Sequence, residues 1–188
     1  MLLRRSILSV PALLLLLTGV SVPVAGPAAA APAEAGKHCV LAAGAAAATC
    51  YDSFPAAIAA VTKGRVRAPD SAAAAATDPA FAAAVSADAV TAASVITGIE
   101  YANINYGGST LTLYASGRCD DNIDADYVWN TLPSGWNDRI SSFKSYNNCA
   151  QQLFRNTYRG GGALTGILVN TANVGSTAND QASSLTAN

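Results

Sequence analysis

The chain has 188 residues, with 11 Lys and Arg against 12 Asp and Glu and a formal net charge of −1. A near-neutral chain without a basic stripe lacks the electrostatic footprint of a nucleic-acid-binding protein, so we expect no nucleic-acid partner. Hydrophobic residues make up 51% of the sequence, which is enough for a packed core in a chain of this length.

The first 31 residues have the pattern of a secretory signal peptide. Arg4-Arg5 precedes an apolar run from Ile7 to Val20, and a tract of small residues, Ala28 to Ala31, follows it. The apolar run contains Pro11 and is short for a membrane span, which needs about 20 residues. We therefore expect cleavage near Ala31, a secreted, extracellular protein, and no membrane span after cleavage.

Four cysteines lie in the part of the chain that we expect to be exported, where oxidation to disulfides is usual. Three connectivities are possible. We favour Cys39–Cys50 and Cys119–Cys149, because each pair then lies within one of two halves that differ in composition. A zinc site is the alternative, but no Cys-x-x-Cys pair is present and the single histidine, His38, adjoins Cys39.

Residues 32–97 are rich in alanine, and we expect them to form an accessory region or a processed pro-region with short helices. A cap residue, an early proline and a terminal glycine predict a helix in the segment from Ser53 to Gly64. The preceding residues, 38–51, predict a small hairpin closed by a disulfide. Residues 65–77 have the composition of a linker, and Asp78-Pro79 begins a second helical stretch.

From residue 98 onward, short alternating runs separated by turn residues predict β-strands. We expect a mainly β fold there, an antiparallel sandwich of two Greek keys over residues 98–188. The expected strands cover 99–106, 110–114, 127–130, 141–146, 151–158 and 164–169.

A polar pattern occurs twice in this second half: Asn137-Asp138-Arg139-Ile140-Ser141-Ser142 and Asn179-Asp180-Gln181-Ala182-Ser183-Ser184. A segment running from an aromatic residue to a glycine lies upstream of each copy, Tyr101 to Gly108 before the first and Phe154 to Gly160 before the second. Such duplication indicates an internal repeat. Loops that offer two Asx side chains and then two hydroxyls present hard oxygen atoms, which are the ligands that calcium prefers.

These motifs resemble those of the microbial βγ-crystallins, including the secreted actinobacterial branch that is grouped with small metalloprotease inhibitors. The resemblance covers about residues 98–188. The family motif joins an aromatic-x4-aromatic-x-Gly corner to a later Asx-Asx-x-x-Ser/Thr-Ser loop. Tyr101, Tyr106 and Gly108 match the first corner in full. The second loop also matches, whereas the second corner does not, because Phe154 stands four residues before Tyr158 instead of five.

The resemblance implies two bound Ca²⁺ ions, each with ligands from both loops. A site would combine a backbone carbonyl and a hydroxyl of one loop with an Asx oxygen of the other. A carbonyl of the corner hairpin, near Glu100–Ala102 or near Leu153–Arg155, would complete it together with water. The implied loop ligands are Asn137, Asp138, Arg139 and Ser141 in the first loop and Asn179, Asp180, Gln181 and Ser183 in the second. With one aspartate per loop we expect weak binding, with a Kd of about 10⁻⁴ to 10⁻³ M. The alternative interpretation is that both loops are ordinary Asx turns.

Another acidic segment, 120–126, has the spacing of an EF-hand loop, but Ala125 stands at the glycine position and Thr131 at the glutamate position, so we interpret it as a solvated loop.

We expect no enzymatic activity, because no nucleophile motif accompanies the lone histidine and the cysteines are expected to be oxidised. The second functional hypothesis, again from the resemblance, is a secreted protease inhibitor. Its exposed loop would be 120–126, tethered by Cys119–Cys149, and its partner would be an extracellular protease. A surface ligand is the other partner expected.

Overall fold

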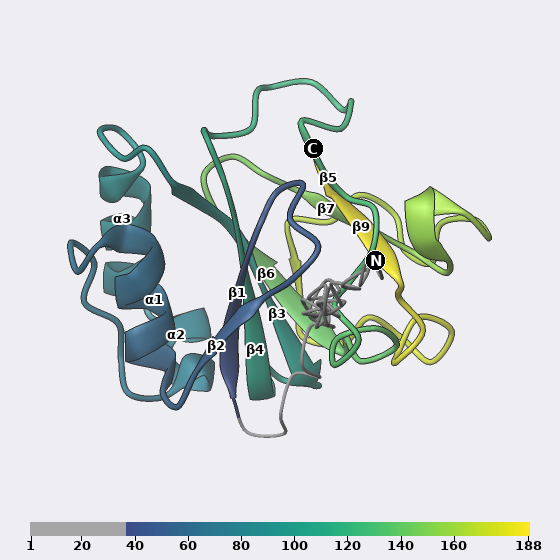
Figure 1. Cartoon of the computed structure of the whole chain (residues 1–188), viewed down its shortest axis with the longest axis horizontal. Helices are drawn as coiled ribbons and strands as arrows, with labels where there is room; N and C mark the ends of the chain where they lie inside the picture. The colour runs from purple at the N-terminus through teal and green to yellow at the C-terminus, as the bar shows by residue number, and fades with distance from the viewer. Residues whose placement is uncertain (1–36) are drawn as a thin grey trace, which may run out of the picture.

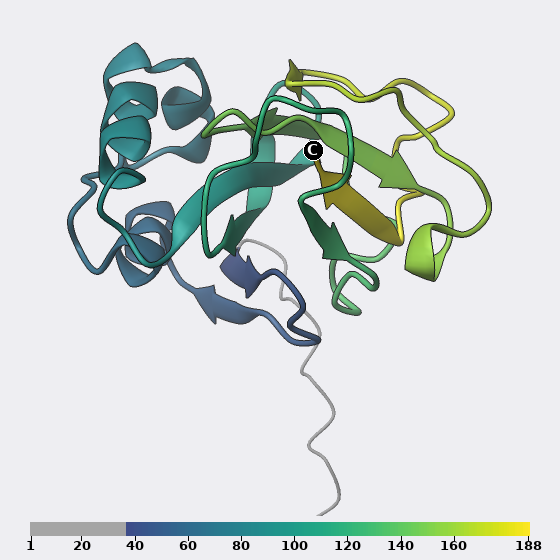
Figure 2. The same ribbon diagram turned by 90° about the horizontal axis from the view of Figure 1, so that it is seen from above.

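The structure is a computed structural model and describes residues 37–188, so the expected signal peptide lies outside the described residues. The fold has three layers: a group of helices, a six-stranded sheet and a three-stranded sheet (Figure 1). The same arrangement seen from above has the helices on one side of the larger sheet and the smaller sheet on the other (Figure 2).

The larger sheet has the strand order β2-β1-β4-β3-β6-β8. Its strands are β1 (His38–Ala42), β2 (Thr49–Tyr51), β3 (Val95–Asn103), β4 (Gly107–Ala115), β6 (Ser142–Ser145) and β8 (Asn170–Thr171). Strand β1 runs parallel to β4, and the other pairs of this sheet are antiparallel. The fold is mainly β, as expected, and all strand pairs formed within residues 98–188 are antiparallel, but the larger sheet as a whole is mixed. The parallel strand comes from the alanine-rich half, which the sequence analysis separated from the sheet.

The smaller sheet is antiparallel, with the order β5-β9-β7. Its strands are β5 (Tyr127–Trp129), β7 (Gln151–Phe154) and β9 (Ser184–Ala187). The expected strand 164–169 is wrong: this segment makes one isolated bridge, Leu168 with Gln151, and a second bridge joins Ala163, just before it, to Phe154. Strand β8 begins only at Asn170. Its apolar residues do not alternate between a buried and an exposed face, because Ile167, Leu168 and Val169 are all exposed.

Three helices, α1 (Phe54–Thr62), α2 (Ala72–Thr77) and α3 (Pro79–Asp88), form the outer layer. The expected caps of α1 and α3 are present: Ser53 accepts a hydrogen bond from the Ala56 N–H at 3.3 Å, and Asp78 accepts one from the Ala80 N–H at 2.8 Å. The segment expected to be a linker contains α2, which Ser71 caps. Alanine is the strongest helix former, so an alanine run behind a cap residue becomes helical where it can pack on the sheet.

Two hydrophobic cores lie on opposite faces of the larger sheet. Phe54 and Phe81 from the helices pack against a sheet face that includes Ile99 and Tyr101. The opposite face packs against the smaller sheet, with residues such as Phe143 and Leu153 in contact there. The division expected between residues 97 and 98 falls inside β3, and the described part of the first half contributes both strands and helices to these cores.

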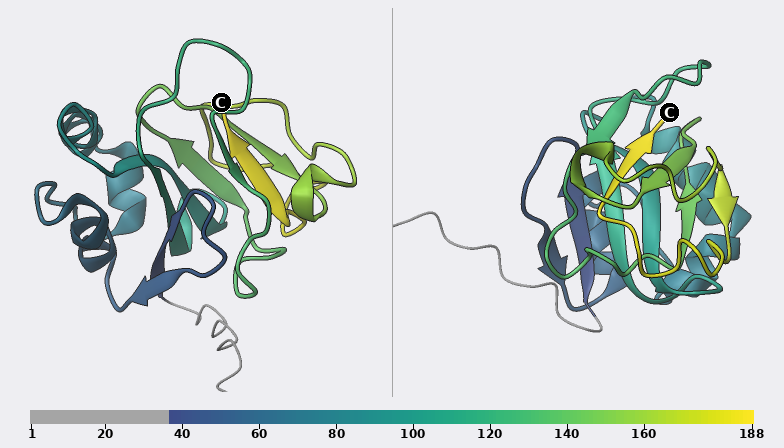
Figure 3. Two further views of the ribbon diagram at one scale, coloured as in Figure 1. Left: turned by 45° about the horizontal axis from the view of Figure 1, so that its top comes forward. Right: turned by 90° about the vertical axis from the view of Figure 1, so that its right-hand side faces the viewer.

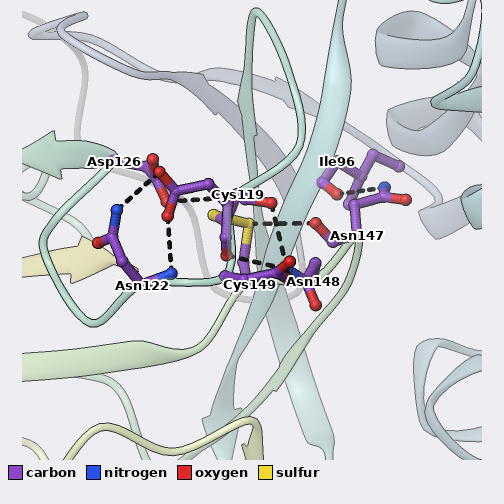
Figure 4. The surroundings of a disulfide bond; sticks show 9 residues. Ile96, Cys119, Asn122, Asp126, Asn147, Asn148 and Cys149 are labelled. Atoms are coloured by element: carbon purple, nitrogen blue, oxygen red, sulfur yellow. Dashed lines mark hydrogen bonds between the residues drawn. A yellow bond between two sulfur atoms is a disulfide. The ribbon is translucent and has the colours of Figure 1, made fainter.

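Both favoured disulfides are present. Cys39–Cys50 joins opposite residues of β1 and β2, and the hairpin expected over residues 38–51 is confirmed. Cys119–Cys149 closes the base of the loop that precedes β5 (Figure 4). Among residues 37–188, no helix is both long enough and apolar enough to cross a membrane.

Candidate metal site

The two repeated loops lie against each other and exchange backbone hydrogen bonds. The Asp138 N–H donates to the Ala182 carbonyl at 2.9 Å, and the Asp180 N–H donates to the Ile140 carbonyl at 3.2 Å. Both aspartates have a φ of 55°, in the left-handed region that Asp tolerates better than most residues. The reciprocal bonds make the loops a single unit related by an approximate two-fold repeat.

Each aspartate is also held by the asparagine before it. The Asn137 side-chain amide donates to Asp138 Oδ2 at 2.7 Å, and the Asn179 amide donates to Asp180 Oδ2 at 2.8 Å. One oxygen of each carboxylate, Oδ2, is therefore engaged within its loop, and Oδ1 is not used by that asparagine.

The last serine of each loop fastens a corner hairpin. Ser142 Oγ donates to the Asn103 carbonyl at 2.6 Å and accepts from the Tyr106 N–H at 3.1 Å. In the second copy Ser184 Oγ donates to the Asn156 carbonyl at 2.6 Å and accepts from the Arg159 N–H at 3.0 Å. These hydroxyls have a structural role and are not available as metal ligands.

The same hydrogen bonds correct the register of the second corner. Arg159 occupies the position of Tyr106, and Phe154, five residues earlier, occupies that of Tyr101. Gly161, with a φ of 70°, takes the place of Gly108, with 78°. The spacing of the second corner is therefore regular, contrary to the sequence interpretation, and the departure is a change of residue type. The regular spacing can be read from the sequence: Arg159 and Gly161 follow Phe154 by five and seven residues, as Tyr106 and Gly108 follow Tyr101.

Three oxygen atoms from three segments converge beside the first corner. Ser141 Oγ lies 3.0 Å from the Ala102 carbonyl oxygen and 3.1 Å from Asp180 Oδ1. The Ser141 N–H is anchored on the Tyr101 carbonyl at 3.0 Å, which holds the residue in place. Ser141, Asp180 and one carbonyl of the range Glu100–Ala102 are thus brought together; the identity of that carbonyl, Ala102, was not specified by the sequence.

The corresponding cluster around Ser183 is not formed in the same way. The Ser183 N–H donates to the Phe154 carbonyl at 3.0 Å, as Ser141 does to Tyr101. Within residues 37–188, however, no hydrogen bond joins the Ser183 hydroxyl to Asp138. Instead, the Arg155 guanidinium donates to Gln181 Oε1 at 3.2 Å at this position of the repeat.

The first loop also carries an arginine, but its guanidinium is held elsewhere. Arg139 lies over the Trp136 ring, 5.6 Å from its centre, and donates to the Gly135 carbonyl at 3.2 Å and to Ser109 Oγ at 3.4 Å. The Trp136 ring is fully buried, and the position that corresponds to it in the second loop is Ala178. The second loop therefore has no ring on which a cation could be held.

The donor set is one of neutral oxygens with a single carboxylate for each position. Within residues 37–188, no group of three or more His, Cys, Asp or Glu side chains gathers at one point. The Arg139 and Gln181 carbonyls accept no hydrogen bond from a described residue. Carbonyls, hydroxyls and one carboxylate fit a hard cation such as Ca²⁺, which accepts neutral oxygen ligands and leaves part of its shell to water.

The acidic segment 120–126 is mainly engaged with itself and with the neighbouring turn. Asp126 accepts from the Asp120 N–H at 3.2 Å, and the Asn148 amide donates to the carbonyls of Cys119 and Asp120 (Figure 4). Ile123 at its tip is 79% exposed.

No protein-family model matches the sequence, and no curated protein matches it. Solved structures similar to about half of this chain are bacterial βγ-crystallin domains. The domain from Clostridium beijerinckii is 20% identical, with 48% of this chain and 95% of that chain covered and a TM-score of 0.37. The domain from Flavobacterium johnsoniae is 21% identical, with 49% and 93% covered and a TM-score of 0.37. A double mutant of clostrillin in complex with nickel is 21% identical, with 48% and 95% covered and a TM-score of 0.37.

Proposed function

We propose that this protein is a secreted calcium-binding module in which Ca²⁺ ties the two repeated loops and their corner hairpins together outside the cell. The observation that carries the proposal is that the Ala102 carbonyl and Asp180 Oδ1 each lie within hydrogen-bond distance of the Ser141 hydroxyl. Three hard oxygens from separate segments are a donor set suited to calcium.

The two ions would be held by corresponding residues of the repeat. The first position would use Ala102, Ser141 and Asp180 with the Arg139 carbonyl. The second would use Arg155, Ser183, Asp138 and the Gln181 carbonyl. A bound ion supplies electrostatic attraction for these oxygens, and since it binds the folded state it raises the free energy of unfolding by mass action. Two disulfides agree with an oxidising compartment, where calcium is available at millimolar level. We propose no catalytic role.

Calorimetric titration of the full disulfide-bonded chain with Ca²⁺ tests the proposal. We expect saturable binding with a Kd of about 10⁻⁴ to 10⁻³ M and a melting temperature that rises with calcium. The Asp180→Ala variant should lose binding at the first position. Asp124→Ala, in the exposed acidic segment, is the matched control and should bind as the wild type does. Absence of heat and of any thermal shift at millimolar calcium would rule the calcium function out.

A second candidate function, the protease inhibitor, is favoured by the loop around Ile123. This tip residue is exposed, while its carbonyl accepts a hydrogen bond from Asn188 at 3.0 Å and the base of the loop is closed by Cys119–Cys149. The loop arches over the C-terminal end of β9 (Figure 3). A braced loop with an apolar tip has the rigidity that an inhibitor needs.

Inhibition assays against a panel of extracellular metalloproteases, with the Ile123→Ala variant alongside, test the inhibitor function. We expect the variant to weaken any inhibition at least tenfold without a change in melting temperature, because Ile123 makes little contact with the core. Inhibition that is equally strong in the variant would assign the activity to another surface.

A further inference from the structure

The two positions of the repeat differ in the residue that supplies the corner carbonyl. In the first position it is Ala102, whose side chain is a methyl group. In the second it is Arg155, whose guanidinium returns to the loop and bonds to Gln181 Oε1 at 3.2 Å. Gln181 in turn donates to the Asp180 carbonyl at 2.8 Å. The residue that corresponds to Ala102 in the repeat thus carries a positive charge, and that charge is held beside Gln181, a second expected ligand residue.

Charge alone does not distinguish the two positions, because Arg139 contributes a guanidinium to the first loop. That guanidinium is fixed over Trp136 and bonded to Gly135 and Ser109. Arg155 has no aromatic ring to hold it, since Ala178 stands where Trp136 stands in the first copy. The Arg155 guanidinium is instead held on Gln181, so its charge lies beside the second position.

The oxygens themselves are also ordered differently. In the first position the Ser141 hydroxyl already contacts both Ala102 and Asp180. In the second, among the described residues, the Ser183 hydroxyl has no bond to Asp138. A cluster that is arranged before binding loses less freedom when the ion arrives, so it binds more tightly.

We propose that the two positions fill in order, the first before the second, and that Arg155 is the residue that keeps the second one weak. This inference rests on the proposed calcium binding. The guanidinium repels the incoming cation, and its hydrogen bond to Gln181 Oε1 holds that positive charge beside the residue whose backbone carbonyl would bind the ion. The protein then has one calcium position that fills first and another that responds at higher calcium concentration.

Calorimetric titration of the full chain and of Arg155→Ala tests the proposal. We expect two steps in the wild type, and in the variant a second step that is tighter by about three- to tenfold at low salt, since a unit charge close to a divalent ion has an effect of this size. The gain should shrink as the salt concentration rises. Asp180→Ala should abolish the tighter step and Asp138→Ala the weaker one.

Two further variants separate charge from shape. Arg155→Lys keeps the positive charge and should keep the second step weak, whereas Arg159→Ala removes an exposed arginine of the same corner and should leave both steps unchanged. Melting temperatures in chelator should agree among all variants within a few degrees, which confirms that they are folded. If Arg155→Ala and Arg159→Ala change the second step equally, or not at all, the role of Arg155 is overturned while calcium binding stands. Absence of binding in every variant would instead overturn the proposed function.

Discussion

A chain that begins at residue 93 should fail to fold on its own, although it contains the whole region that resembles the βγ-crystallins. It would lack the helices and β1, and therefore the cover over one face of the larger sheet. Ile96, Ile99, Tyr101 and Tyr146 on that face are buried in the intact protein. Burying a large apolar side chain contributes about 1.5–3 kcal/mol to the free energy of unfolding. Exposing four of them therefore removes an amount comparable to the whole stability of a typical domain, about 5–15 kcal/mol.

The measurement is an amide NMR spectrum of the fragment 93–188 together with its thermal melt. We expect poor dispersion, no cooperative transition and strong binding of a hydrophobic dye. The control is the full chain with a protease site inserted beside Val90, which is exposed between α3 and β3. Cutting there should leave both pieces associated and folded. A well-dispersed spectrum and a cooperative melt for the fragment alone would mean that residues 37–92 are a removable pro-region.

The Glu100→Gln variant should be more stable than the wild type at neutral pH and should lack the pH dependence that Glu100 contributes. Glu100 is fully buried between the two sheets, and neither of its carboxyl oxygens has a hydrogen-bond partner among the described residues. The Gln151 amide lies beside it, above Gly98, where an added Cβ would come within 2.0 Å of Gln151 Nε2. Burial raises the pKa of Glu100 well above its usual value, and Gln151 opposes this rise only in part, because its geometry falls short of a hydrogen bond.

The sign follows from which state binds the proton. Between the ordinary carboxyl pKa of the unfolded chain and the raised pKa of the folded one, the folded state holds a proton that the unfolded state has lost. The free energy of unfolding therefore falls as the pH rises through this window, by at most about 1.4 kcal/mol per pH unit, and the contribution is complete only below the ordinary pKa. A buried glutamine does not titrate, so the variant lacks this slope.

Urea denaturation of both proteins between pH 4 and pH 9 measures the difference. His38, whose pKa burial lowers, contributes in the opposite direction, but it is common to both proteins and cancels in the comparison. Asp124→Asn, an exposed substitution of the same kind, should follow the wild-type curve. Parallel curves for Glu100→Gln and the wild type would show that the carboxyl is ionised or solvated in the folded protein.

Features with short-range signals were predictable from the sequence. Ser53 and Asp78 mark helix starts because a cap residue acts on N–H groups two or three positions away. The disulfides were predictable because the two cysteines of each pair are close in the sequence, 11 and 30 residues apart, and lie in the same compositional half. Strand β1 was not predictable as a partner of β4, since five residues carry no signal for a partner about 70 residues further on. Strand β9 was likewise not predictable, because its four residues are too few to show an alternating pattern.

The candidate site was predictable to the same extent. The repeated loops identified Ser141 and Asp180, and the resemblance implied that they would meet. The second corner was misaligned because Tyr158 offers an aromatic ring one position before the true equivalent of Tyr106, which is Arg159. The interaction of Arg155 with Gln181 had no signal in the sequence, because it depends on which side chains the corner and the loop bring together.

The parallel pairing of β1 with β4 also determines the order in which the molecule can form. The hairpin of β1 and β2 can close early, since its disulfide spans 11 residues. Its edge remains without a partner until β4 has been synthesised, because β3 and β4 come after all three helices. Contacts between distant segments slow folding, since the intervening chain loses its freedom before any interaction compensates. The helices and β1 therefore reach their final packing only after β3 and β4 have been made, because these strands supply the surface on which the first half packs.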